Sequence, residues 1–385
     1  MRPVLPVVLP AALLFAVALT LPFAAPTQEP AVPATLEALG RDLFFDTNLS
    51  LNRTQSCASC HDPARAFSDP RGAASPGDDG VSLGDRNAPT ATYAALIPPF
   101  GRDAEGRWIG GQFHDGRAAT LEDQAAGPPL NPIEMGMPDA SAVVDRLREN
   151  PAYVAAFPAL FGADVWDDSD TAYAAMTRAI AAFERTEDFA RFDSRYDRFL
   201  RGEITLTPEE ELGRVLFFSQ QFTNCSLCHL GGSSQMDPRE TFSDHRYFNI
   251  GTPENAALRA INGVAPGTVD AGLAAHPGVS GDAGALGQFR VPTLRNVAVT
   301  GPYMHNGVFQ DLRTVILFYN RYNSRDPARQ INPETGAPFG PPPVPGTLAM
   351  EELTHGPALD DRRIDAIVAF LRTLTDARYE PLLEE

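Results

Sequence analysis

Two cysteines and a histidine recur in this chain at one fixed spacing. The first copy is Cys57-Ala58-Ser59-Cys60-His61 and the second is Cys225-Ser226-Leu227-Cys228-His229; together they use all four cysteines of the sequence. In a C-x-x-C-H motif the two thiols add to the vinyl groups of haem and the adjacent imidazole ligates the iron. A zinc knuckle, a redox dithiol or a structural disulfide is the alternative for such cysteines. Two complete copies with no cysteine left over predict two covalently bound haem c groups.

The N-terminus is typical of an exported protein. Arg2 precedes an apolar stretch, Val4 to Phe23, that ends in Ala24-Ala25-Pro26. This is the layout of a secretory signal peptide, so we expect residues 1–25 to be removed and the mature chain to lie in the periplasm. A retained membrane anchor is the alternative, but prolines interrupt a run of only ~20 residues, which is a marginal span. We therefore expect no stable membrane anchor after cleavage.

The composition limits the range of partners. The formal net charge is −18, and loss of Arg2 with the signal makes the mature chain one unit more negative. An acidic surface disfavours nucleic acid and anionic lipid, and it favours a partner with a basic face. The roughly 360 residues that remain are enough for two domains with cores of their own.

Four sequence blocks occur twice and in the same order. The pairs are Leu39–Phe45 with Leu212–Phe218, Phe67–Asp69 with Phe242–Asp244, Ala88–Thr90 with Val291–Thr293, and Phe113–Gly116 with Met304–Gly307. Such a repeat indicates a duplicated domain with one haem in each half. We place the N-terminal haem domain at residues 26–201 and the C-terminal haem domain at residues 202–385.

The pattern of apolar residues and turn signals predicts a mainly α fold of two cytochrome c-like haem domains with long loops. Thr207-Pro208-Glu209-Glu210 offers an N-cap, a proline at the first helical position and an acidic third residue, which together begin a helix. Other helices are predicted at Ser141–Arg148, Thr171–Thr186, Phe189–Leu200, Leu312–Tyr322 and Asp360–Thr375. Gly72–Gly84 and Asn332–Pro345 are predicted to be loops.

Several runs resemble the bacterial di-haem cytochrome c peroxidases and their relatives of the MauG type. In the second half these runs are Gly287–Val297 and Gly301–Gly307; in the first half they are Asp115–Gln124, Gly127-Pro128 and Asn131–Gly136. The resemblance extends over essentially the whole mature chain. It implies an N-terminal haem at which peroxide reacts and a six-coordinate C-terminal haem that stores electrons.

The resemblance also implies a catalytic group. Peroxide chemistry needs an iron with an open coordination site and an acid–base group that moves a proton between the two oxygens. By resemblance Glu134 lies over the open face of the first haem, with Gln124 near it and Pro128 lining the same pocket. The alternative for Glu134 is an ordinary solvated loop carboxylate.

The axial ligands of the first iron differ from those of typical di-haem peroxidases. Those enzymes carry a histidine after the first haem motif that blocks the iron until the enzyme is reduced, whereas no histidine lies between His61 and His114 here. Met135 is the other residue that could reach this iron, and packing is the alternative for it. We therefore expect His61 as the proximal ligand of a five-coordinate, or weakly water-ligated, iron that is open without reductive activation.

The second iron differs in the same direction. His229 is its expected proximal ligand, and His305 is expected to have a structural role nearby. In typical peroxidases the distal ligand is a methionine fourteen residues after the histidine that corresponds to His305. At that position this chain has Tyr319, as in MauG-type proteins. A tyrosine oxygen favours ferric and higher states, whereas a thioether favours ferrous iron. The alternative is that Tyr319 packs in a helix core and Met304 or another group ligates the iron.

An electron relay and a calcium ion are further implied by the resemblance. The family usually has a tryptophan between the haems, where this chain has His114; His114 itself or Trp108 is the candidate relay. The family also binds one calcium ion between its domains, for which Asn87, Thr300 and Pro302 are the matching residues. Oxygen ligands suit this hard cation. The alternative is that these three residues only hold turns.

Three functions compete. In the first, a MauG-like enzyme uses hydrogen peroxide to oxidise a side chain on a separate periplasmic protein. In the second, a cytochrome c peroxidase reduces hydrogen peroxide to water with electrons from a small cytochrome or cupredoxin. In the third, two saturated haems only carry electrons. Glu134, Gln124 and the missing blocking histidine argue against the carrier, and Tyr319 favours the first function over the second.

Overall fold

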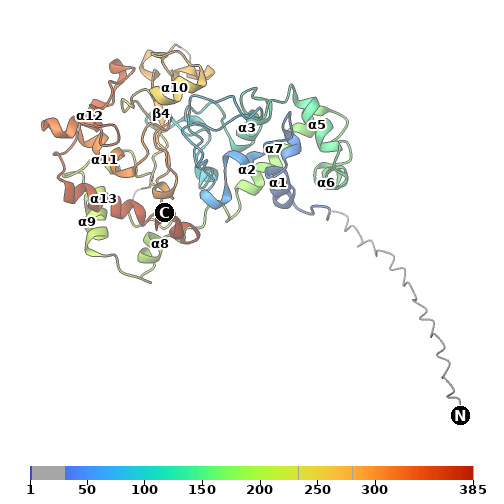
Figure 1. Ribbon diagram of the computed structural model, residues 1–385, viewed down its shortest axis with the longest axis horizontal. Coiled ribbons are helices and arrows are strands. Elements are labelled where there is room, and N and C mark those ends of the chain that lie inside the picture. The colour runs from blue at the N-terminus through green and yellow to red at the C-terminus, as the bar shows by residue number, and fades with distance from the viewer. Residues whose placement is uncertain (2–30, 233, 280, 385) are drawn as a thin grey trace. The chain divides into compact units, whose positions relative to one another are not determined.

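The computed structural model describes Met1 and residues 31–232, 234–279 and 281–384. Apart from Met1, the predicted signal peptide lies outside the described residues. From Val32 onward the chain forms one compact unit, and it is mainly helical with two small sheets, as predicted (Figure 1). No helix in the described ranges is long and apolar enough to cross a membrane.

Thirteen α-helices are present in the described residues. They are α1 (Leu36–Phe44), α2 (Cys57–Cys60), α3 (Leu121–Ala125), α4 (Gly127–Leu130), α5 (Ala140–Arg148), α6 (Pro151–Phe161), α7 (Ser169–Glu184), α8 (Arg195–Leu200), α9 (Pro208–Phe218), α10 (Ala256–Asn262), α11 (Leu312–Asn320), α12 (Met350–Leu353) and α13 (Asp361–Arg372). Each sheet is a two-stranded antiparallel pair: β1 (Gly101–Arg102) with β2 (Trp108–Ile109), and β3 (Tyr247–Phe248) with β4 (Phe289–Arg290).

The predicted helices are confirmed to within a few residues, with one exception. Thr207 caps α9 through a capping box with Glu210, as its sequence indicates. The helix predicted at Phe189–Leu200 is wrong over its first half, because α8 begins only at Arg195. Ser194 caps α8, and Phe192 has a φ of 52°, a left-handed conformation that a right-handed helix cannot contain.

Two aromatic cores hold the helices. In the first, α1 packs against α7 around the rings of Phe44, Phe67, Phe183 and Phe189. In the second, α9 packs against α13 around the rings of Tyr196, Phe217, Phe242 and Phe370. Figure 1 shows α1 beside α7 and α9 beside α13. In each pair, the first helix precedes a haem motif in the sequence, and the second helix lies much later in the same half.

The duplication is visible in the closest contact of each helix pair. Gly40 of α1 lies so near α7 that a Cβ would overlap the carbonyl oxygen of Ala179, and Gly213 of α9 would overlap Ala366 of α13 in the same way. Phe183 and Phe370 lie beside these glycines in the two halves. The repeat therefore extends beyond the blocks seen in the sequence, to α7 and α13.

Gly40→Ala is expected to destabilise the holoprotein by about 1–3 kcal/mol, because the helices must separate to admit the methyl group. In an uncrowded helix, replacing glycine by alanine stabilises by roughly 1 kcal/mol. Destabilisation by Gly40→Ala would therefore be opposite in sign to the usual effect. Gly72→Ala is the control, since no atom lies within 4 Å of a Cβ there. Urea titration followed by circular dichroism measures both variants, and equal midpoints would contradict the close packing of α1 on α7.

Candidate functional site

The first haem motif forms one helical turn with its histidine at the end. Cys57–Cys60 is α2, and Ser56 and Ser59 cap its start reciprocally. His61 follows with its Nδ1 3.2 Å from the carbonyl oxygen of Phe67. Because a carbonyl only accepts, Nδ1 carries the proton and Nε2 is left with its lone pair. Burial lowers the pKa of His61, which keeps the imidazole neutral, the form that binds iron.

The second haem motif repeats this arrangement. Cys225–Leu227 forms a short 3-10 turn, and His229 directs Nδ1 to the carbonyl oxygen of Phe242 at 2.9 Å. Burial lowers the pKa of His229 to about 4. In both halves a threonine hydroxyl holds the loop beside the phenylalanine: Thr90 donates to Ala66 at 2.5 Å and Thr293 donates to Thr241 at 2.7 Å.

A cavity of about 280 Å³ lies beside the second motif. Its walls are mainly apolar and include Cys225, Cys228, His229 and Tyr319. Tyr319 lies on α11, and burial together with the nearby Cys228 and Cys225 thiols raises the pKa of its hydroxyl. That hydroxyl has no hydrogen-bond partner among the described residues. An orphan oxygen in the same apolar cavity as two thiols and a free imidazole nitrogen fits a haem iron with two axial ligands.

Met304 lines the same cavity, so the geometry leaves it as an alternative ligand. It directly precedes His305 and has a φ of 73°, which is unusual for a methionine. The ring of His305 stacks on Phe289 with centroids 3.6 Å apart, and burial lowers the pKa of His305 to about 3. His305 is therefore a neutral, packed imidazole at the wall of the cavity.

Glu134 and Pro128 lie together beside the first motif. The Met135 N–H donates to the Pro128 carbonyl at 3.2 Å, and Asn131 donates to Glu134 Oε1 at 2.8 Å. Burial raises the pKa of Glu134, partly offset by Arg117 and by the Asn131 hydrogen bond. The charge of Glu134 is felt by both Cys57 and Cys60.

Gln124 lies on α3, one helical turn before Pro128, and is half-buried. Met135 is buried in the first core, which favours packing over iron ligation for this residue. Thus Glu134 lies near enough to the first haem motif to raise the pKa of both its thiols. Pro128 is hydrogen-bonded to the segment that carries Glu134, and Gln124 lies on the helix just before Pro128.

The repeat relates Pro128 to Tyr319. Gly116 and Gly307 have similar left-handed φ values of 73° and 62°. Each lies in a turn closed by a single β-bridge, and each turn is followed by a capped helix, α3 or α11. The same offset of 191 residues carries Gly116 to Gly307 and Pro128 to Tyr319. Where α11 continues to Asn320, α3 ends at Ala125 before Gly127-Pro128. The first half therefore has a proline, which offers no side-chain ligand, where the second half has a phenol.

The two relay candidates differ in position. His114 lines the large cavity, and its Nε2 lies 2.8 Å from the carbonyl oxygen of Asn87. Burial lowers the pKa of His114 to about 4. Trp108 instead stacks on Phe100, with Arg102 3.8 Å from its ring centroid, and is not among the described residues that line the cavity.

Asn87, Thr300 and Pro302, the predicted calcium ligands, all line the large cavity. The Asn87 N–H donates to the carbonyl oxygen of His305 at 2.7 Å, which joins the first half to the second at this point. The described residues contain no cluster of three histidine, cysteine, aspartate or glutamate side chains able to hold a metal ion. A cation here would therefore depend on amide and main-chain oxygens, which suit calcium.

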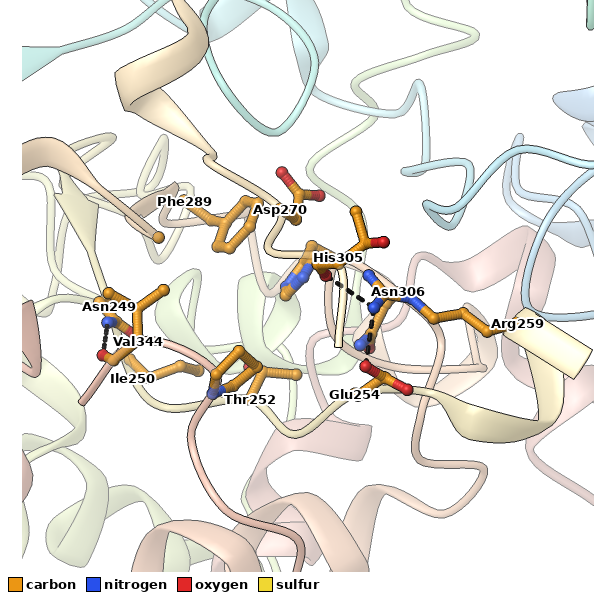
Figure 2. A pocket seen from close by; sticks show the side chains of 13 residues that line it. Asn249, Ile250, Thr252, Glu254, Arg259, Asp270, Phe289, His305, Asn306 and Val344 are labelled. Carbon is orange, nitrogen blue, oxygen red and sulfur yellow. Dashed lines mark hydrogen bonds and ion pairs between the residues drawn. The ribbon is translucent and has the colours of Figure 1, made fainter. Parts of the chain in front are cut away.

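A small polar pocket of about 30 Å³ adjoins the large cavity (Figure 2). His305, Phe289, Ile250 and Thr252 line both spaces. Arg259 lies at its edge and pairs with Glu254 at 2.7 Å and with Asp85 of the first half at 2.8 Å. The Asn306 Oδ1 in this pocket has no described partner. The pocket is large enough for a water molecule.

Sequence reasoning missed two acidic residues of this region. Glu240 accepts hydrogen bonds from the N–H groups of Gly231, Gly232 and Phe242, and so fixes the loop that follows His229. Glu184 of α7 is 6% exposed, burial raises its pKa to about 8, and it raises the pKa of the Cys57 thiol. Neither lies in a haem motif, and only the three-dimensional packing reveals them.

Comparison with known proteins agrees with this geometry. Residues 34–205 match the family model of the di-haem cytochrome c peroxidases. The chain is 57% identical over 369 residues to the methylamine utilization protein MauG of Paracoccus denitrificans, with 94% of each covered. It is 32% identical over 326 residues to the cytochrome-c peroxidase IdrP1 of Denitromonas iodatirespirans, covering 80% and 78% of the two chains. The diheme peroxidase BthA of Burkholderia thailandensis superposes with a TM-score of 0.79 at 34% identity, covering 91% and 88%.

Two haem-attachment sites in a duplicated helical scaffold define a di-haem cytochrome of the peroxidase class. The chain belongs to the di-haem cytochrome c peroxidase and MauG family, and it is more similar to the MauG of Paracoccus denitrificans than to the peroxidase IdrP1. It is thus an oxidoreductase that carries two haem c groups and reacts with peroxide.

Proposed function

We propose that the enzyme is MauG-like: hydrogen peroxide reacts at the N-terminal haem, and the oxidising equivalents are used on a side chain of a separate periplasmic protein. The observation that carries this proposal is the pair formed by Tyr319 and Pro128. An orphan phenol in the second haem cavity supports a ligand that favours oxidised iron, and a proline at the equivalent place supports an open first iron. The 57% identity to a MauG protein supports the same choice.

The roles of the residues at the first haem follow from their positions. When bound, the haem supplies an iron that coordinates peroxide. Glu134, with a raised pKa and one oxygen held by Asn131, is suited to take a proton from one peroxide oxygen and return it to the other. Gln124 offers an amide that hydrogen-bonds peroxide, and Pro128 contributes an apolar wall that excludes side-chain ligands.

Glu134→Gln is expected to lower the rate of reaction with hydrogen peroxide by about 10²- to 10⁴-fold, because the amide keeps the size of the side chain but does not carry the proton. Stopped-flow absorption of the oxidised holoprotein measures this rate. Glu209→Gln, an exposed residue in the first turn of α9, is the control and should react at the native rate. An unchanged rate in Glu134→Gln would remove this residue from the mechanism.

Tyr319→Phe is expected to change the low-spin signal of the second haem in low-temperature EPR, because the phenol oxygen is lost as an axial ligand. Tyr322→Phe is the matched control, since its hydroxyl donates to the Ile250 carbonyl at 3.0 Å and it is outside the described cavity lining. One equivalent of hydrogen peroxide should abolish both haem signals of the native protein without added reductant.

The opposite EPR result would favour the second candidate function. Two low-spin haems that react with peroxide only after partial reduction, with a low-spin signal indifferent to Tyr319→Phe, would indicate a cytochrome c peroxidase. The similarity to the peroxidase IdrP1 keeps this function as the alternative. Its electron donor would be a small cytochrome or cupredoxin, and the acidic chain would favour a donor with a basic face.

The compartment and domain division are part of the same proposal. The signal peptide at residues 1–25 and the periplasmic location rest on the sequence. The division into haem domains at residues 26–201 and 202–385 remains part of the proposal. Two separate aromatic cores support two halves, but the second core already includes Tyr196, six residues before the proposed boundary. Detection of the mature N-terminus by mass spectrometry of the exported protein tests the cleavage.

We expect one calcium ion per chain at Asn87, Thr300 and Pro302. Elemental analysis of the holoprotein should show it in a 1:1 ratio, and Asn87→Ala should lower the calcium content. Removal by a chelator is expected to alter the haem EPR spectrum, because Asn87 is hydrogen-bonded to both His114 and His305. A metal-free native protein would leave these residues with a turn-forming role only.

A further inference from the structure

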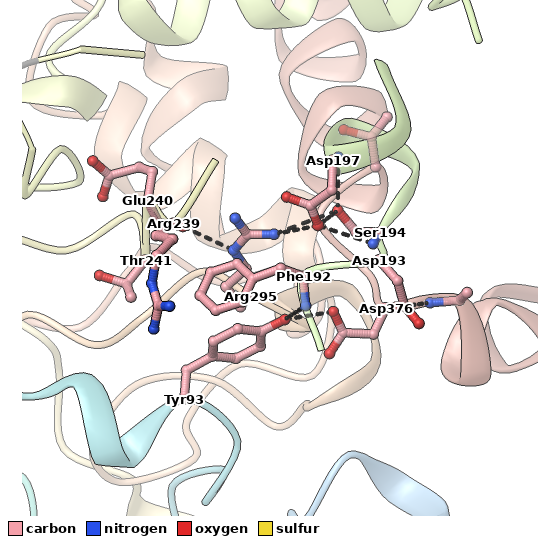
Figure 3. Close-up of polar contacts among 12 residues, drawn as sticks. Tyr93, Phe192, Asp193, Ser194, Asp197, Arg239, Glu240, Thr241, Arg295 and Asp376 are labelled. Carbon is pink, nitrogen blue, oxygen red and sulfur yellow. Dashed lines mark hydrogen bonds and ion pairs between the residues drawn. The ribbon is translucent and has the colours of Figure 1, made fainter. Parts of the chain in front are cut away.

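A buried tyrosine and a buried aspartate face each other where the two halves of the chain meet (Figure 3). The hydroxyl of Tyr93 donates to Asp376 Oδ1 at 2.6 Å and accepts the N–H of Phe192 at 3.1 Å. Tyr93 is 1% exposed and Asp376 is 2% exposed. A short hydrogen bond to a carboxylate is the arrangement in which a phenol can lose an electron and its proton together.

Tyr93 has a strained backbone conformation, which indicates a functional role for its side chain. Its φ is 62°, and its counterpart in the repeat, Asn296, has a φ of 61°. Asparagine adopts this left-handed conformation readily, whereas a tyrosine there is uncommon and is held at a cost. Both residues bind the same carboxylate, since Asn296 Nδ2 donates to Asp376 Oδ2 at 2.9 Å. The first half thus carries a phenol where the second carries the less strained amide.

Contacts lead from Tyr93 to the first proximal histidine. The Tyr93 N–H donates to the Phe189 carbonyl at 2.8 Å. The Phe189 ring stacks on Phe67 with centroids 4.0 Å apart, and Phe67 accepts the hydrogen bond of His61. The route therefore consists of one hydrogen bond, one ring stack and one further hydrogen bond.

A second set of contacts leads from Tyr93 to the other half. The guanidinium of Arg295 lies 5.4 Å from the Tyr93 ring centroid and 5.3 Å from that of Phe242. Phe242 accepts the hydrogen bond of His229. Arg295 is fully buried and pairs with Asp197 at 2.6 Å, so its positive charge beside the phenol is compensated. Tyr93 is in this way connected to both proximal histidines.

We propose that Tyr93 is a redox-active tyrosine that gives one electron to the peroxide-oxidised haem centre while its phenolic proton passes to Asp376. Hydrogen peroxide accepts two electrons and two protons and leaves as two water molecules. Both electrons come from the haem centre and both protons from the solvent. Tyr93 then returns one electron to that centre, so one of the two haem EPR signals should reappear as the radical forms. Tyr93 becomes a neutral phenoxyl radical, and Asp376 becomes a neutral carboxyl group. Burial raises the pKa of Asp376, which supports its role as the proton acceptor.

This inference rests on the proposed reaction with peroxide and adds a place where an oxidising equivalent is held. The test is EPR of the oxidised holoprotein, freeze-quenched after one equivalent of hydrogen peroxide. The native protein should give a narrow radical signal with tyrosine ring-proton splitting, which ring-deuterated tyrosine narrows. The signal should be absent in Tyr93→Phe. It should persist in Tyr196→Phe, a matched control that is fully buried but donates at 2.8 Å to the Gln235 carbonyl, which cannot take a proton.

Asp376→Asn is the second variant, because the amide oxygen still accepts a hydrogen bond but does not take the proton. Its radical yield should fall by about tenfold or more, consistent with loss of a positioned base. An equal radical yield in native protein and Tyr93→Phe, or an undiminished yield in Asp376→Asn, would overturn the assignment. If peroxide abolishes the haem signals of the native protein but no tyrosyl signal forms, the tyrosine inference is wrong while the proposed function stands. Haem signals unchanged by peroxide would instead refute the proposed function.

If Tyr93→Phe fails to fold, deuterium labelling of the native protein and the Asp376→Asn variant still decide the question. Folding is checked by circular dichroism and by the absorption of both haems before peroxide is added. A radical signal that does not narrow with ring-deuterated tyrosine would rule out a tyrosine as its source.

Discussion

Each half of this molecule is organised around one hydrogen bond, from the imidazole of a haem motif to the carbonyl of a phenylalanine in the left-handed region. Phe67 has a φ of 51° and Phe242 a φ of 57°. Phenylalanine rarely adopts this conformation, so its surroundings must hold it. The aromatic cores do so: Phe44 packs edge to face on Phe67, while Phe217 and Phe370 pack edge to face on Phe242. Because the phenylalanine carbonyl sets which imidazole nitrogen carries the proton, the cores also decide how each histidine presents Nε2.

The two halves diverge where their chemistry should differ. On the proximal side, the haem turn, the phenylalanine and the glycine contact between helices are repeated almost residue for residue. On the other side, α11 continues past the point at which α3 is ended by Gly127-Pro128. In the second half the continuous helix α11 carries Tyr319 into the cavity. In the first half α3 ends at Ala125, and the short helix α4 has Pro128, which offers no ligand, at the equivalent place. One duplicated scaffold thus presents different side chains at the equivalent position of its two haem sites.

The sequence predicted the helical class, the haem turns and most helix boundaries, because these depend on local patterns such as capping boxes and C-x-x-C-H spacing. It did not predict the start of α8, which Ser194 and the strained Phe192 determine. Nor did it assign roles to Arg295 or Asp376, whose partners lie far away in the chain. Tyr93 could have been noticed, because the block after Ala88–Thr90 has a tyrosine where its repeat has Asn296. The sequence blocks pair Tyr93 with Asn296, but only the fold shows that both residues bind Asp376.

The contact between the halves is polar and buried, which is an unusual choice if stability were its only purpose. Arg295 donates to Asp197 and to the Glu240 carbonyl at 2.6 and 2.8 Å, and neither charged side chain is exposed by more than 3%. A buried ion pair of this kind commonly adds little stability over apolar residues of the same volume. Its directional hydrogen bonds, however, permit one arrangement, whereas an apolar contact can shift. Electron transfer between two haems depends on their separation. We infer that this cluster fixes that separation by joining the loop after His229 to the segment that leaves the first core.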